Sequence, residues 1–241
     1  MEAAPLPGLE VRRLAGPVPF GEALALQREV HAARRAGTGP DTVLLLEHAP
    51  VVTLGPRTAP GDLRVPEEEL RARGVEVVRT DRGGGITFHG PGQVVAYPVL
   101  DLRAWGLRPR DYLRFLEGLV IGVLAEYGIE GRTVEGRTGV WCGDGKVCAI
   151  GVRVAGGVSL HGLALNVATD LGAFGAIVPC GIRDAGVTSL ARLRSPAPVP
   201  AAGDAAERAA EGATEDAVED AMDRIEAAFR REAAARTGGS R

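Results

Sequence analysis

Two residues of this chain have the types and surroundings that nucleophilic chemistry needs. Lys146 is the only lysine, so every other residue in the basic count is arginine, and Cys180 lies between Pro179 and Gly181. A lysine kept among arginines indicates a need for a compact ammonium, or for a group that can release its proton. The reactive form of cysteine is the thiolate, which a nearby ammonium favours. If the fold brings Lys146 and Cys180 together, the pair suggests acyl transfer.

The other cysteines leave the choice of nucleophile open. Cys148 lies two residues after Lys146 on a predicted strand, so the two side chains would face the same side. Spacing alone therefore makes Cys148 a rival of Cys180. Cys142 and Cys148 have apolar neighbours, among which a cysteine usually behaves as a small buried hydrophobe. The sequence has no Cys-x-x-Cys and no pair of histidines four residues apart, so no metal site is predicted.

The stretch from Arg82 to Gln93, RGGGITFHGPGQ, holds five glycines together with one arginine and one histidine. Glycines this dense let a ligand approach the main chain closely. The stretch matches neither the dinucleotide fingerprint nor the phosphate-binding loop pattern. We interpret it as a substrate-cradling loop between two strands. An ordinary glycine-rich hairpin turn is the alternative.

The composition excludes several classes of protein. The 241 residues include 28 basic and 31 acidic side chains, a net charge of -3, and this balance gives no electrostatic footprint for nucleic acid. No apolar run approaches the roughly 18 residues that a membrane span needs. The N-terminal residues Met1–Pro5 lack the basic and apolar regions of a signal peptide. Three cysteines, an odd number, fit free thiols in a reducing compartment, so a cytoplasmic protein is expected.

The order of elements predicts one α+β domain over residues 1–241, with a mixed β-sheet flanked by helices. Pro98 predicts that its strand ends there or lies at a sheet edge, and Asp144-Gly145 predicts a hairpin. A Pro/Ala-rich insertion is expected at 195–212, followed by a C-terminal helix at 214–231 with Thr214 as its N-cap. Helices are predicted at 21–36, 66–73 and 110–127, and strands at 43–47, 51–54, 75–80, 94–100, 140–142, 146–154 and 158–167.

Four segments carry a resemblance to a known family. The stretch 82–93, with Tyr97-Pro98 after it, resembles the signature of the octanoyltransferases of lipoate biosynthesis, also called lipoate-protein ligase B. The segments KVCAIGVR at 146–153, HGLALNV at 161–167 and IVPCGI at 177–182 are similar to that family in the same order. The resemblance covers 43–190 and implies the biotin/lipoate protein ligase-like fold. The 195–212 insertion departs from the family pattern, away from these motifs.

The resemblance implies a reaction in two steps. Octanoyl-acyl carrier protein would deliver its acyl chain to Cys180 as a thioester. A lysine of a lipoyl domain, on a 2-oxoacid dehydrogenase subunit or the glycine cleavage H protein, would then attack to form an amide. The family position implies that Cys180, and not Cys148, is the nucleophile. It also implies that Lys146 lowers the pKa of Cys180 and relays protons. Amine attack on a thioester is downhill, so neither ATP nor a cofactor is expected.

The same resemblance assigns the substrate-binding residues. The glycine-rich stretch would line the acyl pocket with backbone, and small residues on two later strands would leave room for a straight hydrocarbon chain. His89 and His161 would hydrogen-bond near the thioester, or serve as structural histidines, and Asn166 is a second candidate supporting residue beside His161. The expected binding residues are Arg82, Gly83, Gly84, Gly85, Ile86, Thr87, Phe88, His89, Ala149, Ile150, Gly151, Gly162, Leu163 and Ala164.

Three other functions are consistent with parts of this pattern. An ATP-dependent lipoate or biotin ligase of the same fold would release pyrophosphate, but adenylate chemistry needs no thiol. A non-catalytic module that binds acyl carrier protein or lipoyl domains would form no covalent adduct. A cysteine hydrolase would produce free octanoate and no amide.

Overall fold

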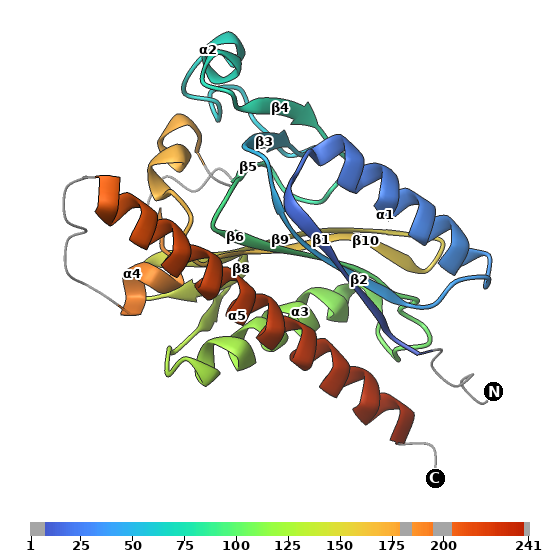
Figure 1. Ribbon diagram of the computed structural model, residues 1–241. Coiled ribbons are helices and arrows are strands. Elements are labelled where there is room, and N and C mark those ends of the chain that lie inside the picture. Colours follow the sequence, from blue (N-terminus) through green and yellow to red (C-terminus); the bar gives the residue numbers. More distant parts are fainter. Residues whose placement is uncertain (1–7, 179–184, 195–203, 239–241) are drawn as a thin grey trace.

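The computed structural model describes residues 8–178, 185–194 and 204–238 and forms two β-sheets with helices packed around them (Figure 1). The helices are α1 (Phe20–Arg35), α2 (Glu67–Ala72), α3 (Pro109–Glu126), α4 (Leu190–Arg194) and α5 (Asp204–Gly238), with a 3-10 helix, η1, at Leu171–Ala176. The strands are β1 (Glu10–Val18), β2 (Thr42–His48), β3 (Val51–Leu54), β4 (Glu76–Arg79), β5 (Ile86–His89), β6 (Gln93–Val99), β7 (Arg132–Val134), β8 (Arg137–Cys142), β9 (Gly145–Ala155), β10 (Val158–Asn166) and β11 (Gly186–Val187).

The larger sheet has the strand order β1-β2-β6-β10-β9-β8-β7, with β11 paired to β9. The β1–β2 and β11–β9 pairs are parallel and the other pairs are antiparallel. The predicted mixed sheet flanked by helices is therefore confirmed. The predicted hairpin is also present, since β8 and β9 pair from Cys142 and Gly145 onward and Asp144 lies in the turn between them.

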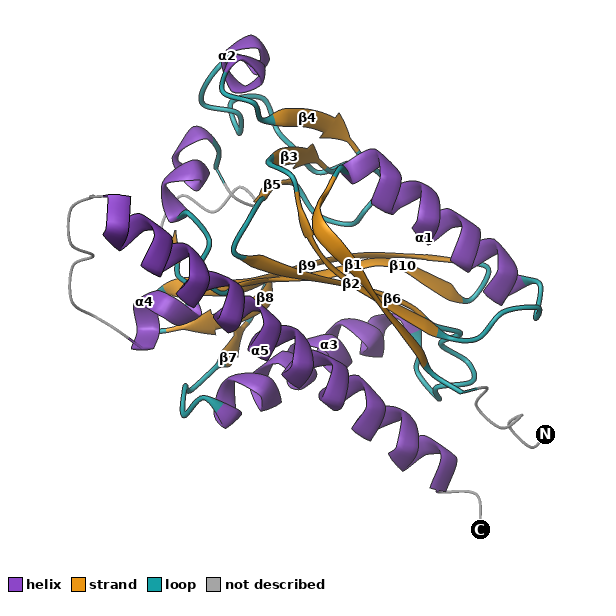
Figure 2. Cartoon of the chain, in the orientation of Figure 1, coloured by secondary structure: helices purple, strands orange, loops and turns teal. Residues whose placement is uncertain are grey.

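Alternating side chains of the larger sheet supply two hydrophobic layers, as expected for strands buried on both faces. Val43 and Leu45 of β2 belong to the largest core cluster, which includes residues of α3 and α5. Leu44 and Leu46 point the other way and pack with Ala23 of α1. Figure 2 shows α3 and α5 on one side of this sheet and α1 on the other. None of the helices in the described ranges is long and apolar enough to cross a membrane.

The smaller sheet has the order β4-β3-β5 and lies at one end of the larger one (Figure 1). Its core joins Val52 of β3 and Ile86 and Phe88 of β5 to Phe174 and Ile177 from the region of η1. The chain passes from β5 in this sheet to β6 in the larger sheet through Gly90–Gly92. The glycine-rich stretch therefore connects the two sheets, and its middle third, Ile86–His89, is a strand and not the loop that the sequence predicted.

Pro98 lies in an interior strand, so the edge position predicted for it is wrong. The other predicted alternative holds, because β6 ends one residue later, at Val99. Strand β6 lies between β2 and β10, and Pro98 pairs with Val43 of β2. On the other side of β6, the ladder with β10 stops at the pair Ala96–Leu163. The Pro98 carbonyl accepts a hydrogen bond from the Ser159 hydroxyl, 2.7 Å away. The missing N–H of Pro98 removes no sheet hydrogen bond, because the regular pairing between β6 and β10 does not extend to Pro98.

The C-terminal helix begins earlier than the sequence predicted. Helix α5 runs from Asp204 to Gly238, so its first turns occupy part of the expected 195–212 insertion, and Thr214 lies inside the helix and does not cap it. Residues from Asp204 onward are rich in alanine, glutamate and arginine, which are strong helix formers, and the last nearby proline is Pro200. Residues 195–203 of the insertion lie outside the described residues.

Candidate functional site

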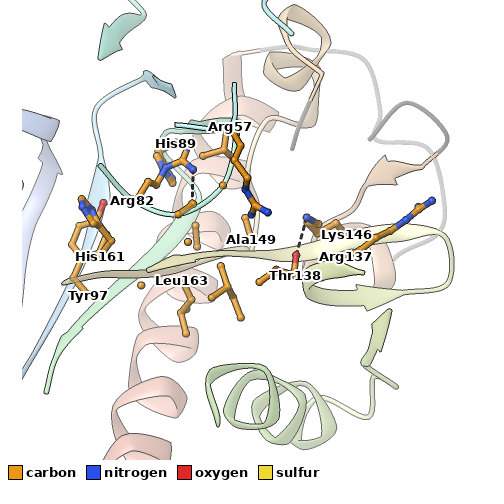
Figure 3. A pocket seen from close by; sticks show the side chains of 18 of the residues that line it. Arg57, Arg82, His89, Tyr97, Arg137, Thr138, Lys146, Ala149, His161 and Leu163 are labelled. Carbon is orange, nitrogen blue, oxygen red and sulfur yellow. Dashed lines mark hydrogen bonds between the residues drawn. The ribbon is translucent and has the colours of Figure 1, made fainter. Parts of the chain in front are cut away.

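A cavity of about 330 Å³ lies between the smaller sheet and strands β9 and β10 of the larger sheet (Figure 3). Its size is at the lower end of the roughly 300–1,000 Å³ of small-molecule sites. We call it the main cavity. It is lined by Arg57, Arg82, Gly83, Gly84, Gly85, Thr87, His89, Tyr97, Gly136, Arg137, Thr138, Lys146, Ala149, Ile150, Gly151, His161, Gly162, Leu163 and Ala164.

Most residues that the sequence predicted for the site line this cavity. They come from the glycine-rich stretch, from β9 and from β10, which are far apart in the sequence. These residues are Arg82, Gly83, Gly84, Gly85, Thr87, His89, Lys146, Ala149, Ile150, Gly151, His161, Gly162, Leu163 and Ala164. Cys180, the predicted nucleophile, lies outside the described residues.

Ile86 and Phe88 do not line the cavity, contrary to the expectation. Successive side chains of a strand point to opposite faces, so Thr87 and His89 face the cavity while Ile86 and Phe88 pack in the core of the smaller sheet. Their role in the fold is to fix the strand that carries Thr87 and His89.

Asn166 also lies outside the cavity lining, and it acts on His89 through Gln93. Gln93 Nε2 donates to Asn166 Oδ1 at 2.9 Å, so Gln93 Oε1 is the atom that faces His89 Nδ1, at 2.7 Å. An amide oxygen only accepts, so His89 carries its proton on Nδ1 and its Nε2 is left as an acceptor when the ring is neutral. Burial lowers the pKa of His89 well below its ordinary value, which keeps the ring neutral.

The wall of the cavity at Gly83 and Gly151 is main chain packed on main chain. Gly83 N–H donates to the carbonyl oxygen of Val152, 3.0 Å away. A Cβ at Gly83 would lie 2.9 Å from that oxygen, and a Cβ at Gly151 would lie 2.6 Å from the carbonyl oxygen of Gly83. Only glycine allows this approach. Arg82 is held beside the cavity by hydrogen bonds from its guanidinium to the hydroxyl and the carbonyl oxygen of Thr53.

Strand β10 is distorted where it passes the cavity. His161 has a φ of 58°, and among the described residues it alone combines a side chain with a positive φ. Such a conformation is uncommon outside glycine and costs energy. A Cβ at the next residue, Gly162, would lie 2.0 Å from the Ala96 carbonyl oxygen. The distortion coincides with the end of the β6–β10 ladder and turns the His161 ring toward the cavity (Figure 3).

His161 is held by an acid outside the cavity. Its Nε2 lies 2.8 Å from Asp81 Oδ1, and Asp81 also pairs with Arg153. Burial lowers the pKa of His161 against the opposing effect of the Asp81 carboxylate. A neutral ring therefore donates from Nε2, and its buried Nδ1 has no hydrogen-bond partner among the described residues.

Lys146 lies where the main cavity meets a second cavity. Its side chain is 5% exposed, and its Nζ donates to the Thr138 carbonyl oxygen at 3.0 Å and lies 5.0 Å from the centre of the Trp141 ring. The second cavity, of about 220 Å³, is lined by Arg64, Trp141, Lys146, Leu171, Phe174, Gly175, Ile177, Ala185, Gly186 and Val187. Lys146 therefore reaches both cavities.

Cys148 does not share a face with Lys146, so the prediction from their two-residue spacing is wrong. Val140 pairs with Cys148 while its neighbour Trp141 pairs with Lys146, which leaves Val147 as the extra residue of a β-bulge. As a result both Val147 and Cys148 pack in the main core. Burial raises the pKa of the Cys148 thiol to about 12, so this thiol is a poor nucleophile. Burial also raises the pKa of the Cys142 thiol.

Five lining residues were absent from the prediction. Arg57, Gly136, Arg137 and Thr138 come from loops or strand ends whose sequences carry no chemical pattern of their own, and only the fold places them at the cavity. Tyr97 was noted only as part of the family signature. Its hydroxyl lies 2.7 Å from His48 Nε2, and His48 Nδ1 lies 2.8 Å from the Val18 carbonyl oxygen, so the ring of Tyr97 is fixed from behind.

No cluster of three or more histidine, cysteine or acidic side chains in the described parts of the chain is arranged to hold a metal ion. The polar side chains that line the main cavity carry guanidinium groups, imidazole rings, hydroxyl groups and one ammonium. This donor set suits an anionic or carbonyl-bearing ligand better than a cation.

Residues 19–211 match the protein-family model named lipoyl protein ligase A/B catalytic domain. The chain belongs to this family. A protein from Rubrobacter xylanophilus named octanoyltransferase is 54% identical over 190 residues, which are 76% of this chain and 83% of that protein. Proteins of the same name from Roseiflexus sp. and Thermobifida fusca are 52% and 51% identical and align with 73% and 72% of this chain and with 74% and 75% of their own lengths.

Solved structures of lipoate-protein ligases share the fold. A putative lipoate protein ligase from T. acidophilum, with bound lipoic acid, has a TM-score of 0.60 at 16% identity, covering 92% of this chain and 93% of its own. A lipoate-protein ligase A bound with ATP has a TM-score of 0.60 at 17% identity, covering 93% and 94%. The expected biotin/lipoate protein ligase-like fold is therefore confirmed.

Proposed function

We propose that this protein is an octanoyltransferase that moves an octanoyl group from octanoyl-acyl carrier protein to a lysine of a lipoyl domain. The Cys180 thiolate attacks the carrier thioester, so a new thioester forms, and the carrier leaves as a thiolate that takes a proton from the Lys146 ammonium. The acceptor amine then attacks this thioester, an amide forms, and the Cys180 thiolate leaves. The proton lost by the amine passes to Lys146 and restores its ammonium. Relatives named octanoyltransferase, at 51–54% identity, support this reaction.

The observation that carries the proposal is the position of Lys146 at the junction of two cavities. The substrate of an acyl transfer has two sides, the acyl chain and the arm that bears the sulfur or the amine. The main cavity suits the chain, because Ala149, Leu163 and Ala164 line it with apolar side chains. The second cavity leaves a path for the arm on the other side of Lys146. An ammonium at this junction favours the thiolate and a developing oxyanion.

The lining groups support substrate binding by shape and by hydrogen bonding. Backbone of Gly83–Gly85 and the small residues of β9 and β10 form the walls, with Arg82 and Arg57 beside them. Neutral His89 and His161 support the site without adding charge next to a hydrocarbon chain. In this proposal Asn166 orients His89 through Gln93. The acceptors are lipoyl domains of 2-oxoacid dehydrogenase subunits and the glycine cleavage H protein, in the cytoplasm, and no cofactor takes part.

The test is a transfer assay with purified protein, octanoyl-acyl carrier protein and a lipoyl domain, without ATP. We expect an octanoyl amide on the domain lysine, detected by mass spectrometry, and no product with Cys180→Ser. A requirement for ATP with release of pyrophosphate would instead identify a ligase. Free octanoate without amide would identify a hydrolase, and binding without any covalent product would identify a binding module.

A further inference from the structure

The peptide group between Thr138 and Gly139 is held at both ends by charged side chains. Its carbonyl oxygen, on Thr138, accepts a hydrogen bond from Lys146 Nζ at 3.0 Å. Its N–H, on Gly139, donates to Oε1 of Glu117 at 3.0 Å. One peptide group therefore joins a carboxylate of helix α3 to the single lysine, on β9.

Both charges are buried, so this linkage matters energetically. Glu117 is 2% exposed and Lys146 is 5% exposed. A buried charge is costly unless it is paired and hydrogen-bonded. Oε2 of Glu117 takes a hydrogen bond from the exposed Arg114 at 2.7 Å, and Oε1 takes the bond from Gly139. Bonds to charged groups are stronger than neutral ones, and bonds in a chain polarise one another.

The position of this peptide is fixed by its surroundings. Gly139 has a φ of 117°, a region that other residues avoid. A Cβ there would lie 2.5 Å from the Cys148 carbonyl oxygen and 3.5 Å from Cδ and Cε of Lys146. The main chain of β8 thus packs directly against the Lys146 side chain, which leaves the Thr138 carbonyl oxygen within reach of Nζ.

We infer that Glu117 is a positioning residue for acyl transfer, which acts on Lys146 through the Thr138–Gly139 peptide. The carboxylate polarises the peptide so that the carbonyl oxygen carries more negative charge, and this oxygen holds the ammonium at the junction of the two cavities. Glu117 itself lines neither cavity. The inference deepens the proposed function and rests on it for its meaning in catalysis, but the linkage itself is testable without any activity.

Other charged and titratable groups also face Lys146, and a test must hold them constant. Those that share a cavity with it are Arg57, Arg64, Arg82, Arg137, His89, His161 and Tyr97, and Cys148 lies close to it on β9. The substitution Glu117→Gln leaves all of them in place. It also keeps an oxygen that can accept the Gly139 bond, so the variant removes charge with little change of shape.

The experiment uses the full chain labelled with lysine carrying ¹⁵N at Nζ, which gives a single side-chain amine signal because Lys146 is the only lysine. In Glu117→Gln we expect this signal to titrate about one pH unit lower than in the unaltered protein, because a nearby carboxylate favours the ammonium. The control Arg114→Gln keeps the carboxylate and removes a cation, so it should not lower the midpoint. An unchanged midpoint in folded Glu117→Gln would overturn the inference.

A second measurement reads the linkage from its other end and does not need a Glu117 variant. In Lys146→Met the amide proton signal of Gly139 should move upfield, because the peptide is no longer polarised by the ammonium. No movement of this signal would also overturn the inference.

In the transfer assay, Glu117→Gln should lower kcat about tenfold, and KM for both substrates should change less than about twofold, because Glu117 lines neither cavity. A rise in KM alone would contradict a role through Lys146. If no variant or wild-type protein transfers octanoate, the proposed function fails while both signals still report on the linkage.

Discussion

Lys146 and Cys148, two residues apart on β9, face different parts of the molecule because Val147 forms a β-bulge between them. Lys146 reaches both cavities, while Cys148 is buried in the core beneath α3. A regular strand would have placed the sulfur beside the ammonium. The bulge therefore decides that the thiol two residues from the lysine is structural.

Replacement of Cys148 tests this separation. We expect Cys148→Ala to retain near-normal octanoyl transfer and to lose about 1 kcal/mol of unfolding free energy, because one buried sulfur is replaced by a small cavity. The rate of amide formation and a urea unfolding curve measure the two effects. Loss of activity in a variant that remains folded would mean that Cys148 takes part in the chemistry.

Lys146→Arg tests whether charge alone is enough. Arginine keeps the positive charge, but it does not release a proton and its planar guanidinium does not replace a compact ammonium between Thr138 and Trp141. We expect kcat to fall at least about a hundredfold, the scale of a lost proton transfer, with the melting temperature as a control for folding. Turnover equal to that of the unaltered protein would leave Lys146 with a purely electrostatic role.

Gly151→Ala tests the close packing of backbone at the cavity wall. Its Cβ would press on the Gly83 carbonyl oxygen, so we expect a loss of about 1–3 kcal/mol in stability and a raised KM for the octanoyl donor. The matched control is Gly118→Ala, at an exposed position of α3 with no atoms near its Cβ. It should stabilise the protein by up to about 1 kcal/mol and leave KM unchanged. Equal effects of the two variants would argue against a special role for Gly151.

Stability should depend on pH through the buried histidines. Burial lowers the pKa of His48 to about 4 and also lowers those of His89 and His161. Between about pH 4 and the ordinary value near 6.5, the unfolded chain binds protons that the folded chain refuses, so stability falls as pH falls. For His48 alone the loss approaches about 3 kcal/mol at pH 4.

Calorimetric melting curves between pH 7.5 and pH 4 measure this effect, on a scale of roughly 1.4 kcal/mol per pH unit for each such histidine. The dependence of stability on pH should become weaker in His48→Gln, because the unfolded variant binds one proton fewer. A melting temperature that stays constant over this window would show that the histidines are not held neutral in the folded protein.

Sequence reasoning found the elements whose patterns are local. The helix α3 and the β8–β9 hairpin follow from periodicity and from turn residues. The residues of β9 and β10 at the cavity followed from the family resemblance. The alternation of side chains over Ile86–His89 could have predicted a strand, but the glycines on both sides favoured a loop. The start of α5 at Asp204 was not predicted, because the Pro/Ala-rich, low-complexity sequence around it favoured an insertion.

What could not be predicted depends on contacts between distant parts of the chain. Strand β1 has a weak pattern of its own and exists through its parallel pairing with β2. The bulge at Val147 appears only when β9 is paired with β8. The link from Glu117 through Gly139 to Lys146 joins a helix to two strands, and no spacing in the sequence indicates it.

The proposed reaction depends on an octanoyl thioester at Cys180, which peptide mapping by mass spectrometry can detect. The protein is incubated with octanoyl-acyl carrier protein in the absence of acceptor, digested at low pH and mapped, and a second sample receives a lipoyl domain before digestion. We expect an octanoyl group on the peptide that contains Cys180, and we expect it to disappear as the amide forms on the domain. An octanoyl group on Cys148 or Cys142, or amide formation without any acylated cysteine, would contradict the proposed reaction.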